Sequence, residues 1–170
     1  MLIRPSTYDD IERLEEIFCH ARLQMAADGN PTQWGDGYPE RHILEKDIQQ
    51  AVSFVLEHEG NICGTFVFII GDDTTYARID DGEWLENSLS YGTIHRIASS
   101  GQHKGIFRIV LDWCTVHCSN IRIDTHADNA RMIHLIEQAG FTRCGIIYTR
   151  NHSPRVAYQL LTKYTKHESY

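Results

Sequence analysis

Apolar residues recur at helical spacing in the N-terminal part of the chain and predict two helices. The first is expected over residues 8–27, after the capping residue Thr7, and its apolar face consists of Ile11, Leu14, Phe18, Ala21 and Met25. The second is expected to begin at Pro39, and its apolar face consists of Ile43, Leu44, Ile48 and Ala51. Residues 28–39 between them are dense in Gly and Pro and predict a loop.

Short apolar runs rich in β-forming residues predict the strands. They occur near Ile3 and over residues 52–56, 62–70, 91–98, 121–126, 141–149 and 155–161. Two further helices are expected, one over residues 107–117 and one that begins at Asp128 or Asn129 and ends at Gly140. Residues 71–90 are polar, acidic and irregular, and they predict a long loop or insertion.

The order of these elements predicts an α/β fold. Strands 91–98 and 121–126 are joined through a helix and must be parallel, because a crossover helix returns the chain to the same edge of the sheet. The hairpin before them and the pair of strands after them are antiparallel. The sequence therefore predicts a mixed, mostly antiparallel sheet with helices on both faces, in a single domain over residues 1–170.

The composition narrows the classes of function. A formal net charge of -7 is the opposite of the basic surplus that nucleic-acid-binding proteins carry. No apolar run reaches membrane-spanning length, and the N-terminus lacks the pattern of a signal peptide. Without a signal peptide, the five cysteines are interpreted as reduced cytosolic thiols, and the ten histidines show no metal-ligand spacing. We expect a cytoplasmic protein that binds no nucleic acid, membrane or metal; a homodimer is left open.

The segment 94–107 carries the clearest chemical signal. It places a strand, a loop of small residues and the start of a helix in succession. The first N–H groups of a helix have no internal partner and lie at the positive end of its dipole, so such a loop can bind phosphate. Lys104 and Arg108 add positive charge. The alternative is an ordinary strand-to-helix loop with a solvated lysine.

Two motifs resemble the GNAT superfamily of N-acetyltransferases. Gln102-x-x-Gly105-x-Phe107 resembles its pyrophosphate signature, Gln/Arg-x-x-Gly-x-Gly/Ala, and departs from it at Phe107, where a bulky ring can restrict or reshape the loop. Residues 129–141, from Asn129 to Gly140-Phe141, resemble the Asn-led helix of the same superfamily. The resemblance implies a seven-stranded sheet whose two central parallel strands splay, and acetyl-CoA as co-substrate.

The resemblance also implies where acetyl-CoA binds. The pantetheine arm would lie between strands 91–98 and 121–126, paired with backbone groups of His95, Arg96 and Ile97, and Asn129 would contact it. The pyrophosphate would be held by the loop that Gln102 opens, through the backbone N–H groups of His103, Lys104, Gly105, Ile106, Phe107 and Arg108.

The reaction that the resemblance implies is direct attack of a primary amine, from a small molecule or a peptide, on the acetyl thioester. Many members carry a tyrosine acid where this chain has Ile136. A thiol pKa of about 8.5 makes the missing proton cost about 2 kcal/mol at most, and Tyr148, Tyr91 or water can supply it. The alternative function is a CoA-binding sensor or interaction module without turnover, which Ile136 and Phe107 favour.

A general base matters more to this reaction than a general acid when the acceptor is a lysine-like amine. Keeping an amine of pKa about 10.4 neutral at pH 7 costs about 4.6 kcal/mol, whereas an α-amino group costs about 1 kcal/mol. Histidine has an ordinary pKa suited to this task. His95, Asp124 and His126 are the candidates, because they lie on the two strands that flank the thioester. The competing interpretation of Asp124 is a structural carboxylate bonded to a backbone group or to Arg122.

Residues 28–39 are the predicted acceptor loop. They contain Asp28, Trp34, Asp36 and Tyr38; carboxylates attract an ammonium group, and aromatic faces can hold a cation. Its glycines would let the loop close over a substrate. The competing interpretation is that Trp34 and Tyr38 pin the loop to the core. We expect a small cationic amine or a peptide N-terminus as acceptor, rather than a nucleic acid or a lipid.

Overall fold

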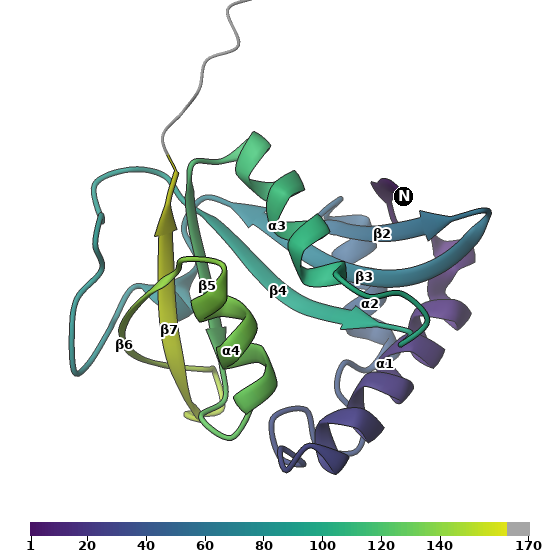
Figure 1. The fold of residues 1–170 in the computed structure, drawn as a ribbon, viewed down its shortest axis with the longest axis horizontal. Helices are drawn as coiled ribbons and strands as arrows, with labels where there is room; N and C mark the ends of the chain where they lie inside the picture. The colour runs from purple at the N-terminus through teal and green to yellow at the C-terminus, as the bar shows by residue number, and fades with distance from the viewer. Residues whose placement is uncertain (163–170) are drawn as a thin grey trace, which may run out of the picture.

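A computed structural model describes residues 1–162, which form a seven-stranded sheet and four α-helices (Figure 1). The strands are β1 (Leu2–Pro5), β2 (Ser53–His58), β3 (Asn61–Ile70), β4 (Gly92–Ser99), β5 (Asn120–Thr125), β6 (Thr142–Tyr148) and β7 (Pro154–Leu161). The helices are α1 (Ile11–Ala27), α2 (Arg41–Gln49), α3 (Ile106–His117) and α4 (Ala130–Gln138), with the 3-10 turns η1 (Tyr8–Asp10) and η2 (Thr74–Tyr76).

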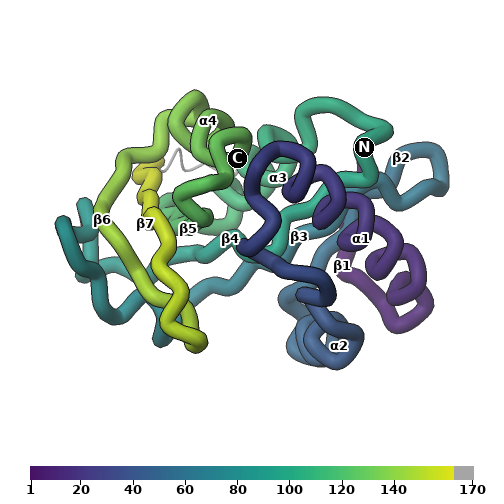
Figure 2. The backbone as a smooth tube through the Cα atoms, turned by 90° about the horizontal axis from the view of Figure 1, so that it is seen from below, coloured from purple at the N-terminus to yellow at the C-terminus, as the bar shows by residue number. Residues whose placement is uncertain are grey.

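The strands follow the order β1-β2-β3-β4-β5-β7-β6, and β4-β5 is the one parallel pair in this sheet. Helices α3 and α4 cover one face, where they share a core with Ile94, Ile121 and Ile123 (Figures 1 and 2). Helices α1 and α2 cover the other face over the N-terminal strands. The α/β fold with a mixed, mostly antiparallel sheet is therefore confirmed.

The parallel pair β4-β5 separates soon after it forms. Its Cα partners are Gly92 with Ile121, Thr93 with Arg122 and Ile94 with Ile123, and the pairing ends there. Opposite β3, a β-bulge adds one residue to β4 between His95 and Ala98, and Arg96 in this bulge has a φ of 48°. A bulge bends its strand, so β4 turns away from β5 and leaves a fork between them.

Several boundaries differ by a few residues from those that the sequence predicts. Helix α2 begins at Arg41 rather than Pro39 and ends at Gln49, so Ala51 lies beyond its apolar face. The first turn of the helix expected from residue 8 is a 3-10 turn, and α1 itself begins at Ile11. Strand β5 ends at Thr125, so His126 lies in the loop before α4 rather than in the strand. None of the helices in residues 1–162 is long and apolar enough to cross a membrane.

The segment between β3 and β4, residues 71–91, seals the C-terminal half of the sheet face that α1 and α2 leave open. Its Tyr76, Trp84 and Tyr91 form a small core with Ile147 of β6 and Ala157 of β7. The loop predicted for residues 71–90 is therefore packed, and it contains η2.

Arg122 of β5 anchors this segment. Its side chain is 1% exposed, and its guanidinium carbon lies 4.0 Å from the ring centre of Trp84 and 3.8 Å from that of Tyr91. It donates hydrogen bonds of 2.9 Å to the Glu86 carbonyl and to Asn87. Burial lowers the pKa of Arg122 from its ordinary value, and the two ring faces and the hydrogen bonds offset that cost.

We expect Arg122→Gln to destabilise the protein by about 2–4 kcal/mol, because it removes two cation–π contacts and two hydrogen bonds from a charged donor. Arg143→Gln, on an exposed position of β6, is the matched control and should stay within about 0.5 kcal/mol of wild type. Urea unfolding gives both free energies. Equal values for the two variants would show that Arg122 does not anchor the segment.

Candidate functional site

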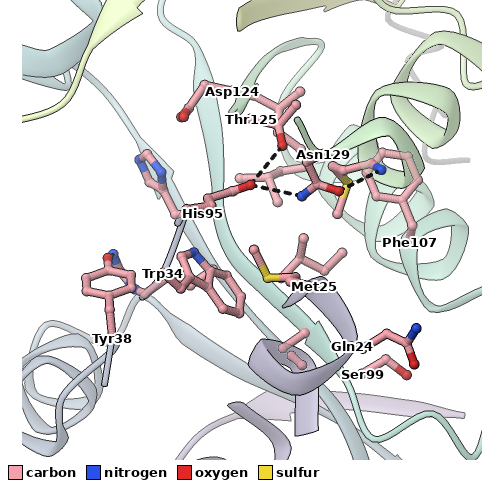
Figure 3. A pocket seen from close by; sticks show the side chains of 18 of the residues that line it. Gln24, Met25, Trp34, Tyr38, His95, Ser99, Phe107, Asp124, Thr125 and Asn129 are labelled. Atoms are coloured by element: carbon pink, nitrogen blue, oxygen red, sulfur yellow. Dashed lines mark hydrogen bonds between the residues drawn. The ribbon is translucent and has the colours of Figure 1, made fainter. Parts of the chain in front are cut away.

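A cleft of about 1550 Å³ occupies the fork between β4 and β5. It extends from the loop before α3 to residues 28–39, the interhelix loop between α1 and α2. Figure 3 shows Trp34 and Tyr38 on one side of it and Phe107 and Asn129 on the other. The fork therefore brings together the two segments that the sequence assigns to cofactor and acceptor.

The loop before α3 ends in a helix N-terminus that faces the cleft. Gly105 is the N-cap and has a φ of 76°, while a Cβ at this position would meet no atom within 4 Å. The backbone conformation, rather than lack of space, therefore favours glycine here. The Ile109 N–H is paired with the Gly105 carbonyl at 3.1 Å, so the N–H groups of the three preceding residues are free of helical bonds.

The six residues of the signature, from Gln102 to Phe107, all line the cleft, and the Arg108 side chain does not. Arg108 forms an exposed ion pair of 2.8 Å with Asp112, which leaves only its backbone N–H at the helix start. The Phe107 side chain is 7% exposed and belongs to the core under α3 and α4. The Phe107 ring therefore packs into the core and does not crowd the loop. The left-handed backbone conformation at Gly105 is kept.

The bulge in β4 exposes backbone along the fork. His95, Arg96 and Ile97 lie beyond the last β4-β5 pair and line the cleft. The Arg96 side chain turns to α2, where it donates two hydrogen bonds of 2.8 and 2.9 Å to Asp47 and one of 2.9 Å to the Tyr38 hydroxyl. These bonds hold the bulge in place, so the backbone of residues 95–97 is available to a ligand in the fork.

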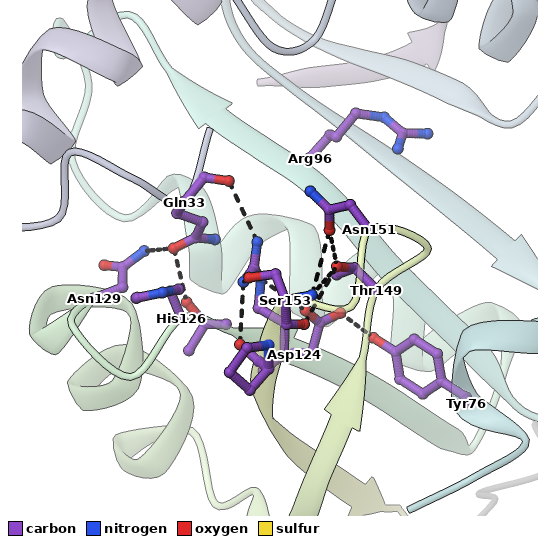
Figure 4. Close-up of polar contacts among 12 residues, drawn as sticks. Gln33, Tyr76, Arg96, Asp124, His126, Asn129, Thr149, Asn151 and Ser153 are labelled. Atoms are coloured by element: carbon purple, nitrogen blue, oxygen red, sulfur yellow. Dashed lines mark hydrogen bonds and ion pairs between the residues drawn. The ribbon is translucent and has the colours of Figure 1, made fainter. Parts of the chain in front are cut away.

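His95 and Asp124 are the first residues after the last pair on their two strands, so both lie where the fork opens. His95 Nε2 is 2.9 Å from an Asp73 carboxylate oxygen. The Tyr76 hydroxyl donates to Asp124, and Arg155 Nε lies 3.9 Å from the same carboxylate (Figure 4). The interpretation of Asp124 as a partner of Arg122 is therefore wrong, because Arg122 contacts the 71–91 segment instead.

The protonation states of Asp73 and Tyr76 are set by burial and by the groups that contact them. Burial raises the pKa of Asp73, but hydrogen bonds from His95 and Thr75 outweigh it and hold the pKa well below the ordinary value. Burial and the Asp124 carboxylate raise the pKa of Tyr76 well above its ordinary value. Asp73 is therefore an ionised acceptor and Tyr76 a protonated donor near neutral pH.

No sequence pattern singles out Asp73 or Tyr76 as site residues. They lie 22 residues from His95 and 48 residues from Asp124, in a segment that reads as a polar loop. The one available signal is an acidic stretch just before the strand that carries His95, and acidic stretches are usually solvated surface.

The structure does not bring His126 and Tyr148 into the cleft. His126 Nδ1 accepts the Asp128 N–H at 3.3 Å, within the turn before α4. Tyr148 ends the edge strand β6 and is 39% exposed. Tyr91 is buried against Arg122, and Ile136 is fully buried in the core.

Asn129 caps α4, as the sequence predicts, and also holds the interhelix loop. Its Oδ1 accepts the Met132 N–H at 3.1 Å, and its Nδ2 donates to Gln33 Oε1 at 3.0 Å (Figure 4). Arg155 donates to the Gln33 carbonyl at 3.3 Å. Gln33 therefore ties the interhelix loop to the far side of the fork, a link that no sequence pattern indicated.

The aromatic residues of the interhelix loop pack on the protein as well as lining the cleft. The Trp34 ring lies 5.6 Å from that of Phe18 and 6.3 Å from that of Tyr38. Asp28 is paired with Arg131 at 3.4 Å. These contacts agree with the interpretation that Trp34 and Tyr38 pin the loop, and both rings remain available at the cleft surface.

No protein-family model and no curated protein sequence matches this chain. Among solved structures, an acetyltransferase of the GNAT family from Streptococcus agalactiae 2603 is similar with a TM-score of 0.86 and 28% identity, over 96% of each chain.

Two more distant structures contain ligands. The yncA protein of Salmonella typhimurium, solved with its cofactor acetyl-CoA, has a TM-score of 0.61 and 18% identity, over 96% of this chain and 95% of its own. A chain of the NatC complex, solved with Gag peptide and CoA, has a TM-score of 0.55 and 18% identity, over 95% of this chain and 98% of its own. At this identity they show the shared fold alone. The resemblance read from the two motifs is confirmed, and the chain has the fold of the GNAT superfamily of N-acetyltransferases.

Proposed function

We propose that this protein transfers an acetyl group from acetyl-CoA to a primary amine of a small molecule or a peptide. The observation that carries the proposal is the open fork between β4 and β5. A helix N-terminus with free N–H groups lies at one end of its cleft, and His95 and Asp124 lie where the strands part. The yncA structure, which has the same fold, holds acetyl-CoA.

The cofactor would be held mainly by backbone groups. The N–H groups at the start of α3 would bind the pyrophosphate, with Gln102 and Lys104 at the rim. The pantetheine arm would lie along residues 95–97, where β4 has left β5. Asn129 would contact it through the second N–H of its amide, because the other N–H is bonded to Gln33 of the interhelix loop.

Acetyl transfer at the fork needs a base for the amine proton and a hydrogen-bond donor for the oxyanion that forms. The amine nitrogen would form a bond to the acetyl carbonyl carbon, the C–S bond would break, and the thiolate would take a proton from water. His95 would accept the proton that the amine loses, while a backbone N–H near Ile97 would stabilise the oxyanion.

The acceptor would approach from the side of the interhelix loop. Asp28 and Asp47 are each paired with an arginine, at 3.4 Å and 2.8 Å. Asp124 is contacted by the Tyr76 hydroxyl and by Arg155 only at 3.9 Å. Among these three cleft carboxylates, Asp124 is thus the one best placed to meet an incoming ammonium group.

Gly105→Val tests the cofactor loop. We expect it to weaken CoA binding tenfold or more, because a β-branched residue is strained at this φ and would distort the N–H groups that follow. Gly140→Val, at the end of α4, is the matched control: its φ is 89° against 76° for Gly105, and neither Cβ would meet an atom within 4 Å. Isothermal titration with CoA should show unchanged affinity for the control. Unchanged affinity for Gly105→Val as well would show that the loop does not bind CoA.

His95→Ala tests the transfer reaction. Over a panel of small amines and peptide N-termini, wild type should release thiol from acetyl-CoA, and His95→Ala should lower kcat/KM about 10²–10⁴-fold. His134→Ala, on the exposed face of α4, should leave the rate near wild type. Tight CoA binding without thiol release for any amine would favour the sensor or interaction module instead.

A further inference from the structure

The 71–91 segment places one carboxylate directly on the ring of His95. Asp73 Oδ2 is 2.9 Å from His95 Nε2, and both side chains are largely buried, at 18% and 19% exposure. Hydrogen bonds between an imidazole and a carboxylate fix the orientation of the ring. The contact joins two parts of the chain that share no strand pairing at this position.

Asp73 is itself held by three contacts, two with Thr75 and one with the Tyr91 hydroxyl. Its other carboxylate oxygen accepts the Thr75 N–H at 2.9 Å and also contacts the Thr75 hydroxyl. The N–H of Asp73 is bonded to the Tyr91 hydroxyl at 2.9 Å. Since the Tyr91 ring stacks on the buried Arg122 guanidinium at 3.8 Å, the carboxylate is attached to the anchored part of the segment and has little freedom to move.

This contact selects one tautomer of His95. An ionised carboxylate can only accept hydrogen bonds, so Nε2 must carry the proton of a neutral ring and Nδ1 must carry the lone pair. Within residues 1–162, Nδ1 has no hydrogen-bond partner, and His95 lines the cleft. The unprotonated nitrogen is therefore the one left for chemistry.

Other charged or titratable groups pack beside His95 or line the same cleft, and within residues 1–162 none of them forms a hydrogen bond with its nitrogens. They are Tyr76 of η2, Asp47 of α2, Arg96 of β4, Asp124 of β5 and Arg155 of β7. The Tyr76 ring lies 5.8 Å from the imidazole at 76°, an edge contact that packs the ring rather than bonding it. Asp73 is therefore the group that decides which nitrogen carries the proton.

We propose that Asp73 is the positioning residue for His95, and that it holds the imidazole in the Nε2–H tautomer with Nδ1 open to the acceptor amine. The amine proton passes to Nδ1 as the C–N bond forms and the C–S bond breaks, and the ring returns that proton to solvent after the product leaves. The catalytic consequence rests on the proposed acetyl transfer, whereas the tautomer is a property of the free protein.

The first experiment reads the tautomer directly. Nitrogen-15 NMR of labelled protein, with His95 assigned through His95→Gln, should show Nε2 protonated and Nδ1 unprotonated in the wild type. Asp73→Asn should lose this pattern, and Asp72→Asn, one position away on an exposed residue, should keep it. If Asp73→Asn does not fold, as judged by thermal unfolding, Asp73→Ser takes its place. A pattern unchanged by loss of the carboxylate overturns the proposal.

The second experiment is a double-mutant cycle on kcat/KM for an accepted amine. Asp73→Asn should lower the rate about 10–100-fold, Asp72→Asn should not, and Asp73→Asn added to His95→Ala should lower it no further. A rate loss of the same size in both backgrounds overturns the positioning role. If wild type acetylates no amine, the proposed function fails, and the NMR comparison still decides whether Asp73 sets the tautomer.

Discussion

The separation of β4 from β5 is the constraint on which the rest of this structure depends. Parallel strands normally continue their ladder of hydrogen bonds, but the bulge at Arg96 ends this ladder after the pair Ile94 and Ile123. Backbone groups that a continuous sheet would consume are left for a ligand. The bulge is in turn held by the pairing of Arg96 with Asp47 and Tyr38, so α2 and the interhelix loop help to keep the fork open.

Most of the fold could be predicted from the sequence, because local patterns such as helical spacing and capping residues determine its helices and strands. The helical stripe of Ile11, Leu14 and Phe18 and the Asn129 cap both correspond to elements of the structure. The parallel pair followed from the crossover helix. The boundary at Thr125 could not be predicted, since β5 ends where its pairing with β7 ends, and that pairing depends on a distant part of the chain.

The candidate site was predicted only in part, because local motifs can be recognised in a sequence whereas contacts between distant segments cannot. The loop before α3 is a local motif, and its glycine at positive φ follows from a short stretch of sequence. The contacts of Asp73 with His95 and of Tyr76 with Asp124 span the sheet, and no single sequence encodes them by spacing. Arg122 shows the limit most clearly, because a charged residue in a strand reads as exposed until two aromatic rings from another segment enclose it.

Residues 71–91 have two roles: they pack against the sheet, and they place a carboxylate at the fork. Trp84 and Tyr91 enclose a buried cation on β5, and the same short segment presents a carboxylate to the fork. If Asp73 positions His95 as proposed, substitutions in this small core would reduce turnover without touching any group in the cleft. In a screen scored by activity alone, such positions would be mistaken for participants in the reaction, and only parallel measurement of folding would tell the two apart.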